Sequence, residues 1–228
     1  EMTVGRFSIA GFYERRIRRI FPALFAMLGL SCVVASILFL PYDFKEFGFS
    51  LAAATLFVSN IFFWQTTDYF SGLAHLKPLL HTWSLSVEEQ FYIAYPVLLV
   101  AIQRWGRGAF RSWLMAFFAV SFAISVWSMT EKPVAGFYLA PTRAWELLLG
   151  ALLALGVPPI VTSRYILEAL GALGLLLIGW TIVAFSPSMP FPGVNALAPC
   201  VGAALLIYSG QGSPTYASRL LSLKPLVF

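Results

Sequence analysis

Seven apolar blocks alternate with short polar segments along the chain. Most are close to the roughly 20 residues that a helix needs to cross a hydrocarbon core about 30 Å thick. They lack the period-two alternation of β-barrel strands, and lipid cannot satisfy the backbone of an open sheet. The pattern predicts an all-α, polytopic transmembrane helix bundle of about six or seven apolar helices. The blocks are 20–40, 47–64, 85–103, 112–130, 143–156, 165–185 and 194–209.

The composition supports lipid as the solvent of this chain. Of its 228 residues, 59% are hydrophobic and 11% are charged, whereas a soluble domain carries about 25% charged residues. The net charge of +5 fits membrane topology and contact with anionic membrane lipid better than nucleic-acid binding. Cys32 and Cys200 lie in apolar blocks and offer neither a disulfide framework nor metal-ligand spacing. We therefore expect no metal and no nucleic-acid partner.

The distribution of Lys and Arg tests the topology. If all seven blocks cross, eight of the fifteen cations lie on the side of the arginine cluster at 15–19. If 47–84 instead starts and ends on the outer side, eleven of the fifteen lie on the cluster's side, as the positive-inside rule requires. The sequence therefore predicts that 47–84 is re-entrant. Such backbone has to be buried in protein or line a cavity, which Asp68 and Tyr69 would face.

Arg15, Arg16, Arg18 and Arg19 stand directly before the first apolar block. A topology anchor touching anionic headgroups accounts for their charge. The use of arginine throughout also suits bidentate contact with phosphate, for which lysine is only a point charge. The second interpretation is therefore a cytoplasmic site for a nucleotide-bearing cosubstrate. Spacing alone favours the anchor and leaves both interpretations open.

A second polar group precedes and enters the block at 85–103. Ser86 and Glu89 have the spacing of a capping box, so Glu89 is a candidate cap of its own helix. Glu88 has no such explanation, and a carboxylate in a membrane usually faces a polar cavity or a partner. On a helix, His81, Ser84 and Glu88 share one face, where they would bind a sugar, relay a proton or form a buried hydrogen-bond network.

A third group is Arg143 and Glu146, which are three residues apart and able to pair on one helix. One interpretation is a self-neutralising pair that lowers the free energy of placing charges near the membrane interface. The other is that each side chain reaches another helix or a ligand. Gly171, Gly174 and Gly179 are typical of close helix packing.

Three runs in these regions resemble the acyltransferase family 3 membrane proteins. They are FYERRIRRIFP at 12–22, LLHTWSLSVEEQFY at 79–92 and FYLAPTRAWELLLG at 137–150. Their order and spacing also match, so the resemblance covers essentially the whole chain. It implies a bundle of about ten helices that moves an acyl group, usually acetyl, from cytoplasmic acyl-CoA to a sugar hydroxyl outside, for example on lipopolysaccharide O-antigen, peptidoglycan or exopolysaccharide.

The resemblance also implies roles for individual residues. Arg15, Arg16 and Arg19 match the arginines expected at the phosphates of acetyl-CoA. Glu88, Glu89, Arg143 and Glu146 match supporting polar groups between donor and acceptor, and His81, Ser86 and Asp68 are candidates to bind the acceptor. No residue here matches the family's proposed catalytic histidine, which lies in an earlier helix. We therefore interpret residues 1–228 as part of one acyltransferase transmembrane domain that lacks its N-terminal helices and C-terminal end, and expect this fragment to be inactive alone.

The leading hypothesis is a multi-pass O-acyltransferase of the bacterial inner membrane. Its expected partners are membrane lipid, the acyl-CoA donor, the sugar acceptor and, from the wording of the second and third runs, a C-terminal extracytoplasmic SGNH domain. The alternative is a transporter or flippase of a glycolipid, which also needs intramembrane charges and a broken helix. A third possibility is a structural membrane subunit.

Overall fold

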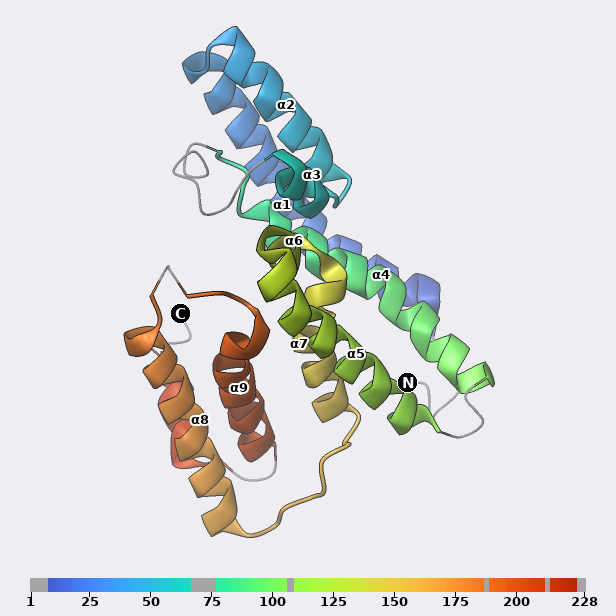
Figure 1. Ribbon diagram of the computed structural model, residues 1–228, viewed down its shortest axis with the longest axis vertical. Helices are drawn as coiled ribbons and strands as arrows, with labels where there is room; N and C mark the ends of the chain where they lie inside the picture. Colours follow the sequence, from blue (N-terminus) through green and yellow to red (C-terminus); the bar gives the residue numbers. More distant parts are fainter. Residues whose placement is uncertain (1–7, 67–76, 106–108, 187–188, 212–213, 225–228) are drawn as a thin grey trace. The chain divides into compact units, whose positions relative to one another are not determined.

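The computed structural model describes residues 8–66, 77–105, 109–186, 189–211 and 214–224 (Figure 1). Every regular element in these residues is helical, which confirms the predicted all-α class. Within these ranges, five helical segments are long and apolar enough to cross a membrane, and the chain is therefore that of a multi-pass membrane protein. They are Ala10–Leu38, Thr82–Arg104, Phe110–Glu131, Arg164–Ala184 and Gly193–Gly210. The chain forms two compact units, 1–101 and 102–228, and each is described by itself.

The first helix of unit 1, α1 (Ile9–Leu38), is longer than the apolar block predicted. It begins where the Ser8 hydroxyl accepts a hydrogen bond from the Gly11 amide, and it continues through Pro22. The arginines at 15–19 precede the apolar block but lie inside the helix. Ser8 is a favourable N-cap residue, and it fixes a helix start upstream of the apolar pattern.

The apolar block predicted at 47–64 is two helices. Helix α2 (Pro41–Thr55) packs beside α1, and α3 (Ser59–Thr66) follows a break at which Phe57 has a φ of 55° (Figure 1). At 1.5 Å per residue, α2 is about 22 Å long and α3 about 12 Å, so neither reaches across a 30 Å core. The break agrees with the re-entrant interpretation of 47–84. That this stretch starts and ends on the outer side of the membrane stays a prediction.

Lys77 lies close to the end of α3. Its Nζ donates a hydrogen bond to the carbonyl oxygen of Thr66, the last residue of that helix, at 3.0 Å. Burial lowers the pKa of Lys77, and the negative charge of Glu46 opposes that shift. A cation at a helix C-terminus satisfies one of its open carbonyls. Asp68 and Tyr69, the candidates to face the re-entrant cavity, lie outside the described residues.

Helix α4 (Thr82–Trp105) completes the described part of unit 1. It begins one turn earlier than a capping box at Ser86 requires, so the capping box is wrong. Ser86 and Glu89 both lie inside the helix and are buried. These polar side chains do not cap the helix. Instead, Glu89 contacts α1 and Ser86 contacts α3.

Unit 2 contains α5 (Phe110–Glu131), α6 (Pro133–Tyr138) and α7 (Ala140–Ala154). Helices α5 and α7 pack side by side (Figure 1). Prolines near the starts of α6 and α7 mark the two turns that reverse the chain. Helix α7 corresponds to the apolar block at 143–156. At 15 residues it is about 22 Å long, which makes it shorter than the five candidate spans.

The rest of unit 2 is built around α8 (Arg164–Ala184) and α9 (Leu197–Gly210), with the short helices η3 (Gly193–Ala196) and α10 (Tyr216–Leu221). A Cβ at Gly174 would lie 2.7 Å from the Gly202 carbonyl oxygen of α9, and a Cβ at Gly171 would lie 3.1 Å from Ala217 of α10. The predicted close packing is confirmed at these two positions. It is wrong at Gly179, where a Cβ would meet open space.

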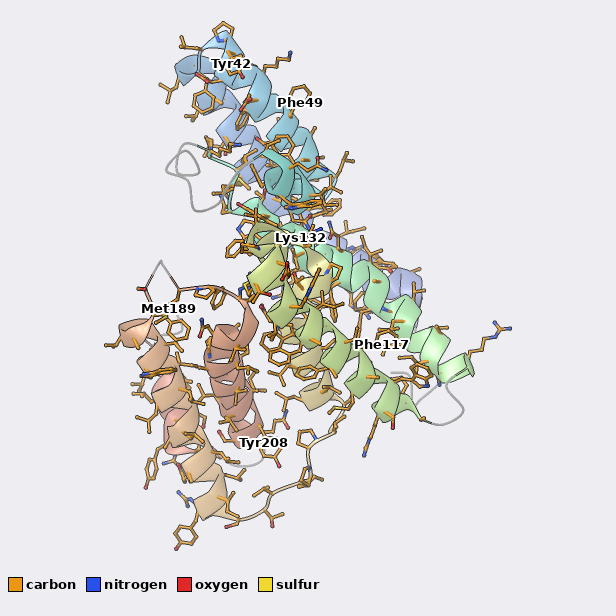
Figure 2. All side chains as sticks on the ribbon, viewed as in Figure 1. Tyr42, Phe49, Phe117, Lys132, Met189 and Tyr208 are labelled. Carbon is orange, nitrogen blue, oxygen red and sulfur yellow. The ribbon has the colours of Figure 1, made fainter. Side chains whose placement is uncertain are left out.

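Large apolar side chains are exposed along the outer faces of both units. Tyr42 and Phe49 on α2 and Phe117 on α5 are examples (Figure 2). In water such surfaces would mark interaction sites or aggregation hazards. In a membrane protein they are the expected lipid-facing surface, while the buried positions hold both apolar and polar side chains.

Candidate functional site

The arginines of α1 divide into an outward row and one inward side chain. With 3.6 residues per turn, Arg15, Arg18 and Arg19 fall within an arc of roughly 100°, and all three are exposed. Arg18 pairs with Glu14 on the same helix at 2.7 Å. Arg16 lies about 60° outside that arc and is partly buried. Of the sequence-predicted phosphate ligands, Arg15 and Arg19 therefore remain accessible to solvent or ligand.

Arg16 is fixed to α4 through its guanidinium group. Its Nε donates to both carboxylate oxygens of Glu89, at 2.9 and 3.2 Å. Its Cζ lies 3.1 Å from the centroid of the Tyr92 ring, so the same group stacks on an aromatic face. One turn before Arg16, the Tyr13 hydroxyl donates to the Ile93 carbonyl oxygen at 2.9 Å. Glu89 is thus the partner of a cation on another helix.

A second face of α4 holds the start of α3 through hydroxyl groups. The Ser59 amide donates to the Ser86 hydroxyl at 3.2 Å, and the Ser59 and Ser86 hydroxyl oxygens are 2.7 Å apart. The Thr82 hydroxyl, one turn earlier on α4, lies 3.0 Å from the Ser59 hydroxyl. All three residues are buried. Ser86, which we expected to bind substrate, is therefore part of a buried network between helices.

Gln90 closes the break between α2 and α3. Its side-chain amide donates to the Phe57 carbonyl oxygen at 2.9 Å and to Asn60 Oδ1 at 2.8 Å, and its Oε1 accepts from Asn60 Nδ2 at 3.2 Å. Non-helical backbone at membrane depth has to be satisfied inside the protein. Gln90 satisfies the carbonyl oxygen of Phe57, the left-handed residue at the break. The run at 79–92 therefore stabilises the break between α2 and α3.

Replacing Gln90 with Leu is expected to destabilise the protein by about 1–2 kcal/mol, because the Phe57 carbonyl and the Asn60 amide both lose a buried partner. The measurement is reversible unfolding in mixed detergent micelles. Gln103→Leu is the matched control, since Gln103 is on the same helix and exposed. Equal stability of the two variants would contradict the assigned role of Gln90.

The predicted face of His81, Ser84 and Glu88 does not form a cluster. His81 precedes α4, and its Nδ1 lies 3.1 Å from the Pro78 carbonyl oxygen. The Ser84 hydroxyl donates to the His81 carbonyl oxygen, and all three side chains are exposed. Glu88, which we expected to face a polar cavity or a partner, is exposed, and Glu89 is the buried carboxylate. Roles for His81 and Glu88 in acceptor binding stay predictions.

In unit 2, Arg143 and Glu146 form the predicted intrahelical pair near the start of α7. Arg143 Nη2 donates to Glu146 Oε2 at 2.8 Å, and the two side chains are only 15% and 18% exposed. The guanidinium carbon lies 5.7 Å from the centroid of the Phe137 ring and 5.8 Å from that of Phe191. Glu146 Oε1 is buried without a hydrogen-bond partner among the described residues. The two charges therefore neutralise each other between aromatic rings, and one carboxylate oxygen of Glu146 has no hydrogen-bond donor among the described residues.

Neighbouring residues fix the orientation of α7. The Ser121 hydroxyl of α5 donates to the Pro141 carbonyl oxygen at 2.7 Å and accepts from the Trp145 amide at 2.9 Å. The Trp145 ring packs edge-on against Phe118 and Phe122 of α5 and is fully buried. These contacts with α5 fix the rotation of α7 about its own axis, and with it the direction in which Arg143 and Glu146 point.

Sequence reasoning missed several residues that organise these sites. Gln90 and Tyr92 belong to a run that had been singled out, and their polar or aromatic character at i+4 and i+6 from Ser86 was an available signal. Tyr13 also belongs to such a run, at 12–22, whereas Asn60 lies outside all three runs and carried no such signal. Among the described residues, no group of three His, Cys, Asp or Glu side chains is placed to hold a metal ion.

The comparison with known proteins decides the family. The family model for the acyltransferase domain, Acyl_transf_3, matches residues 2–227. The chain belongs to acyltransferase family 3. Members of this family are enzymes that transfer acyl groups, so the polar clusters of both units belong to an acyltransferase.

Relatives within acyltransferase family 3 differ in length. An uncharacterized protein of Haemophilus influenzae is 31% identical over 220 residues, which cover 92% of this chain and 90% of that protein. The peptidoglycan O-acetyltransferase OatA of Listeria monocytogenes is 29% identical over 230 residues, which cover 94% of this chain but 36% of OatA. The Staphylococcus aureus relative SACOL0978 is 27% identical over 186 residues, 30% of its length. The chain therefore spans about a third of these last two relatives. No solved structure matches it significantly.

Proposed function

We propose that the protein transfers an acetyl group from acetyl-CoA to a hydroxyl of an extracytoplasmic polysaccharide, acting in the bacterial inner membrane. The observation that carries the proposal is the row of exposed arginines on α1, close to the start of a helix able to cross the membrane. Arginine binds phosphate through two parallel N–H bonds. We propose acetyl-CoA as the donor because it carries both an acyl group and phosphates, and the chain belongs to an acyltransferase family.

Within this proposal, Arg15 and Arg19 bind the donor's phosphates and Arg16 belongs to the same site. Glu88 and Glu89 in unit 1, and Arg143 and Glu146 in unit 2, support the transfer by ordering the helices of their own units. Asp68, His81 and Ser86 are candidate contacts of the sugar. The acceptor is proposed as a surface glycan because OatA, by its name, acts on peptidoglycan. The O-antigen of lipopolysaccharide is a second candidate acceptor.

The first test compares ester-linked acetyl in surface glycans from cells with the intact gene and with the gene deleted. We expect acetyl to fall in one glycan on deletion and to return on complementation. Unchanged acetyl content in every surface glycan, together with altered glycolipid export, would favour a transporter and overturn the proposal.

Arg19→Gln and Arg15→Gln are each expected to lower kcat/KM for acetyl-CoA about 10- to 100-fold, the equivalent of one charge-assisted contact. The kinetics are measured on membranes that contain equal amounts of the intact protein. Arg111→Gln is the control, because Arg111 is also exposed but lies on α5. A loss of the same size in Arg111→Gln would show that general charge, and not the α1 row, sets the donor affinity.

A further inference from the structure

The basic segment of α1 is attached to α4 at two successive turns. Tyr13 donates to the backbone of Ile93, and Arg16 is both paired with Glu89 and stacked on Tyr92. Tyr13 and Arg16 are three residues apart, so they lie on the same side of α1. Two attachments on one side restrict rotation of the helix about its own axis. The direction in which the remaining arginines point is therefore set by α4.

Arg16 is poorly placed to act as a phosphate ligand itself. Its Nε is occupied by both oxygens of Glu89, and one face of its guanidinium group is covered by the Tyr92 ring. A phosphate that approached Arg16 would also approach the Glu89 carboxylate, and like charges at short range repel. Arg15 and Arg19 lie roughly 100° and 60° away around the helix, where they are exposed.

We infer that Arg16, Glu89 and Tyr92 form a positioning clamp, in which Arg16 orients α1 so that Arg15 and Arg19 present their guanidinium groups to the phosphates of the donor. This inference rests on the proposed function. It gives the run at 79–92 a role in donor binding without contact between that run and the donor. It also distinguishes Arg15 and Arg19, as ligands, from Arg16, as an anchor.

Equilibrium binding of acetyl-CoA to the purified intact protein separates an anchor from a ligand. If Arg16 is an anchor, Arg16→Gln and Glu89→Gln each raise the Kd about tenfold, which corresponds to about 1.4 kcal/mol. The double variant Arg16→Gln/Glu89→Gln is then no weaker than either single variant, because both substitutions break one unit. If Arg16 is a phosphate ligand, Glu89→Gln leaves the Kd unchanged or lowers it, and that result would overturn the inference.

Charge exchange provides a second criterion. Arg16→Glu/Glu89→Arg restores the anchor pair with its polarity reversed, so the Kd is expected to return to within about threefold of the original. A phosphate ligand at position 16 would not be rescued in this way. Glu131→Gln is the control, since Glu131 is an exposed carboxylate on α5 and has no assigned role in binding or transfer. Size-exclusion profiles and thermal midpoints identify any variant that fails to fold. If the charge-exchange variant fails, the Kd values of Arg16→Gln, Glu89→Gln and the double Gln variant distinguish an anchor from a ligand.

The outcomes also separate this inference from the proposed function. Failure of the unsubstituted protein to bind acetyl-CoA overturns both. Binding with the expected pattern in the variants, but without acetyl transfer to any glycan, overturns the proposed reaction and supports the clamp. Saturating acetyl-CoA should restore kcat in Arg16→Gln to within about twofold, because an anchor for the donor site affects KM more than the chemical step.

Discussion

Arg143→Gln is expected to destabilise the protein by about 3–5 kcal/mol. The substitution leaves the Glu146 carboxylate largely buried, with one oxygen that already lacks a hydrogen-bond partner among the described residues. Breaking a buried pair by removing one partner is strongly destabilising, because the remaining charge is uncompensated. The measurement is the free energy of unfolding in mixed detergent micelles.

Two further variants make the Arg143 experiment specific. Arg143→Gln/Glu146→Gln removes both charges and should recover much of the loss, since no buried charge is left unpaired. Arg18→Gln removes the cation of an exposed pair, whose Arg18 Nη2 and Glu14 Oε1 atoms are 2.7 Å apart with side chains 79% and 62% exposed. That control should change stability by less than about 1 kcal/mol. A double variant less stable than Arg143→Gln would contradict the account of this pair.

Trp145→Ala is expected to have a comparable effect, a loss of about 3 kcal/mol. The ring is fully buried and packs edge-on against Phe118 and Phe122 of the neighbouring helix. Truncation of a buried Trp to Ala in a soluble core costs about 3–5 kcal/mol. The lower end of this range applies here. Lipid is itself apolar, so Trp145 loses only its packing contacts with α5 and not a hydrophobic transfer from water.

Trp127→Ala is the matched control for Trp145, because Trp127 is exposed on α5. It should leave the free energy of unfolding nearly unchanged. Trp145→Phe keeps a ring in the same place and removes an Nε1 donor that has no partner among the described residues, so its loss should be smaller than that of Trp145→Ala. Similar losses in Trp127→Ala and Trp145→Ala would show that ring packing against α5 is not the cause.

The apolar pattern was sufficient to predict helices, but not where each begins or breaks. Apolar periodicity cannot locate a helix start that is set by a cap, and Ser8 begins α1 well before its apolar block. The break at Phe57 lies inside an apolar run and is stabilised by Gln90, which is distant in sequence. Charge distribution still indicated that this run does not cross as one helix.

The candidate site was predictable at the level of motifs and less so at the level of contacts. The pair of Arg143 and Glu146 follows from spacing on one helix, so the sequence identified it directly. The partner of Glu89 did not follow, because Arg16 is 73 residues away and the local pattern suggested a capping box instead. The choice between Glu88 and Glu89 as the inward carboxylate depends on the phase of α4, which begins at Thr82.

The most direct test of the central claim follows the acetyl group from donor to acceptor. Membrane vesicles with the cytoplasmic face exposed, containing the intact protein and endogenous glycan, are supplied with acetyl-CoA labelled in the acetyl group. We expect base-labile label in the polysaccharide, lost in vesicles without the protein and strongly reduced by Arg19→Gln but not by Arg111→Gln. Label in the polysaccharide that is independent of the protein, or no label with any surface glycan, would contradict it.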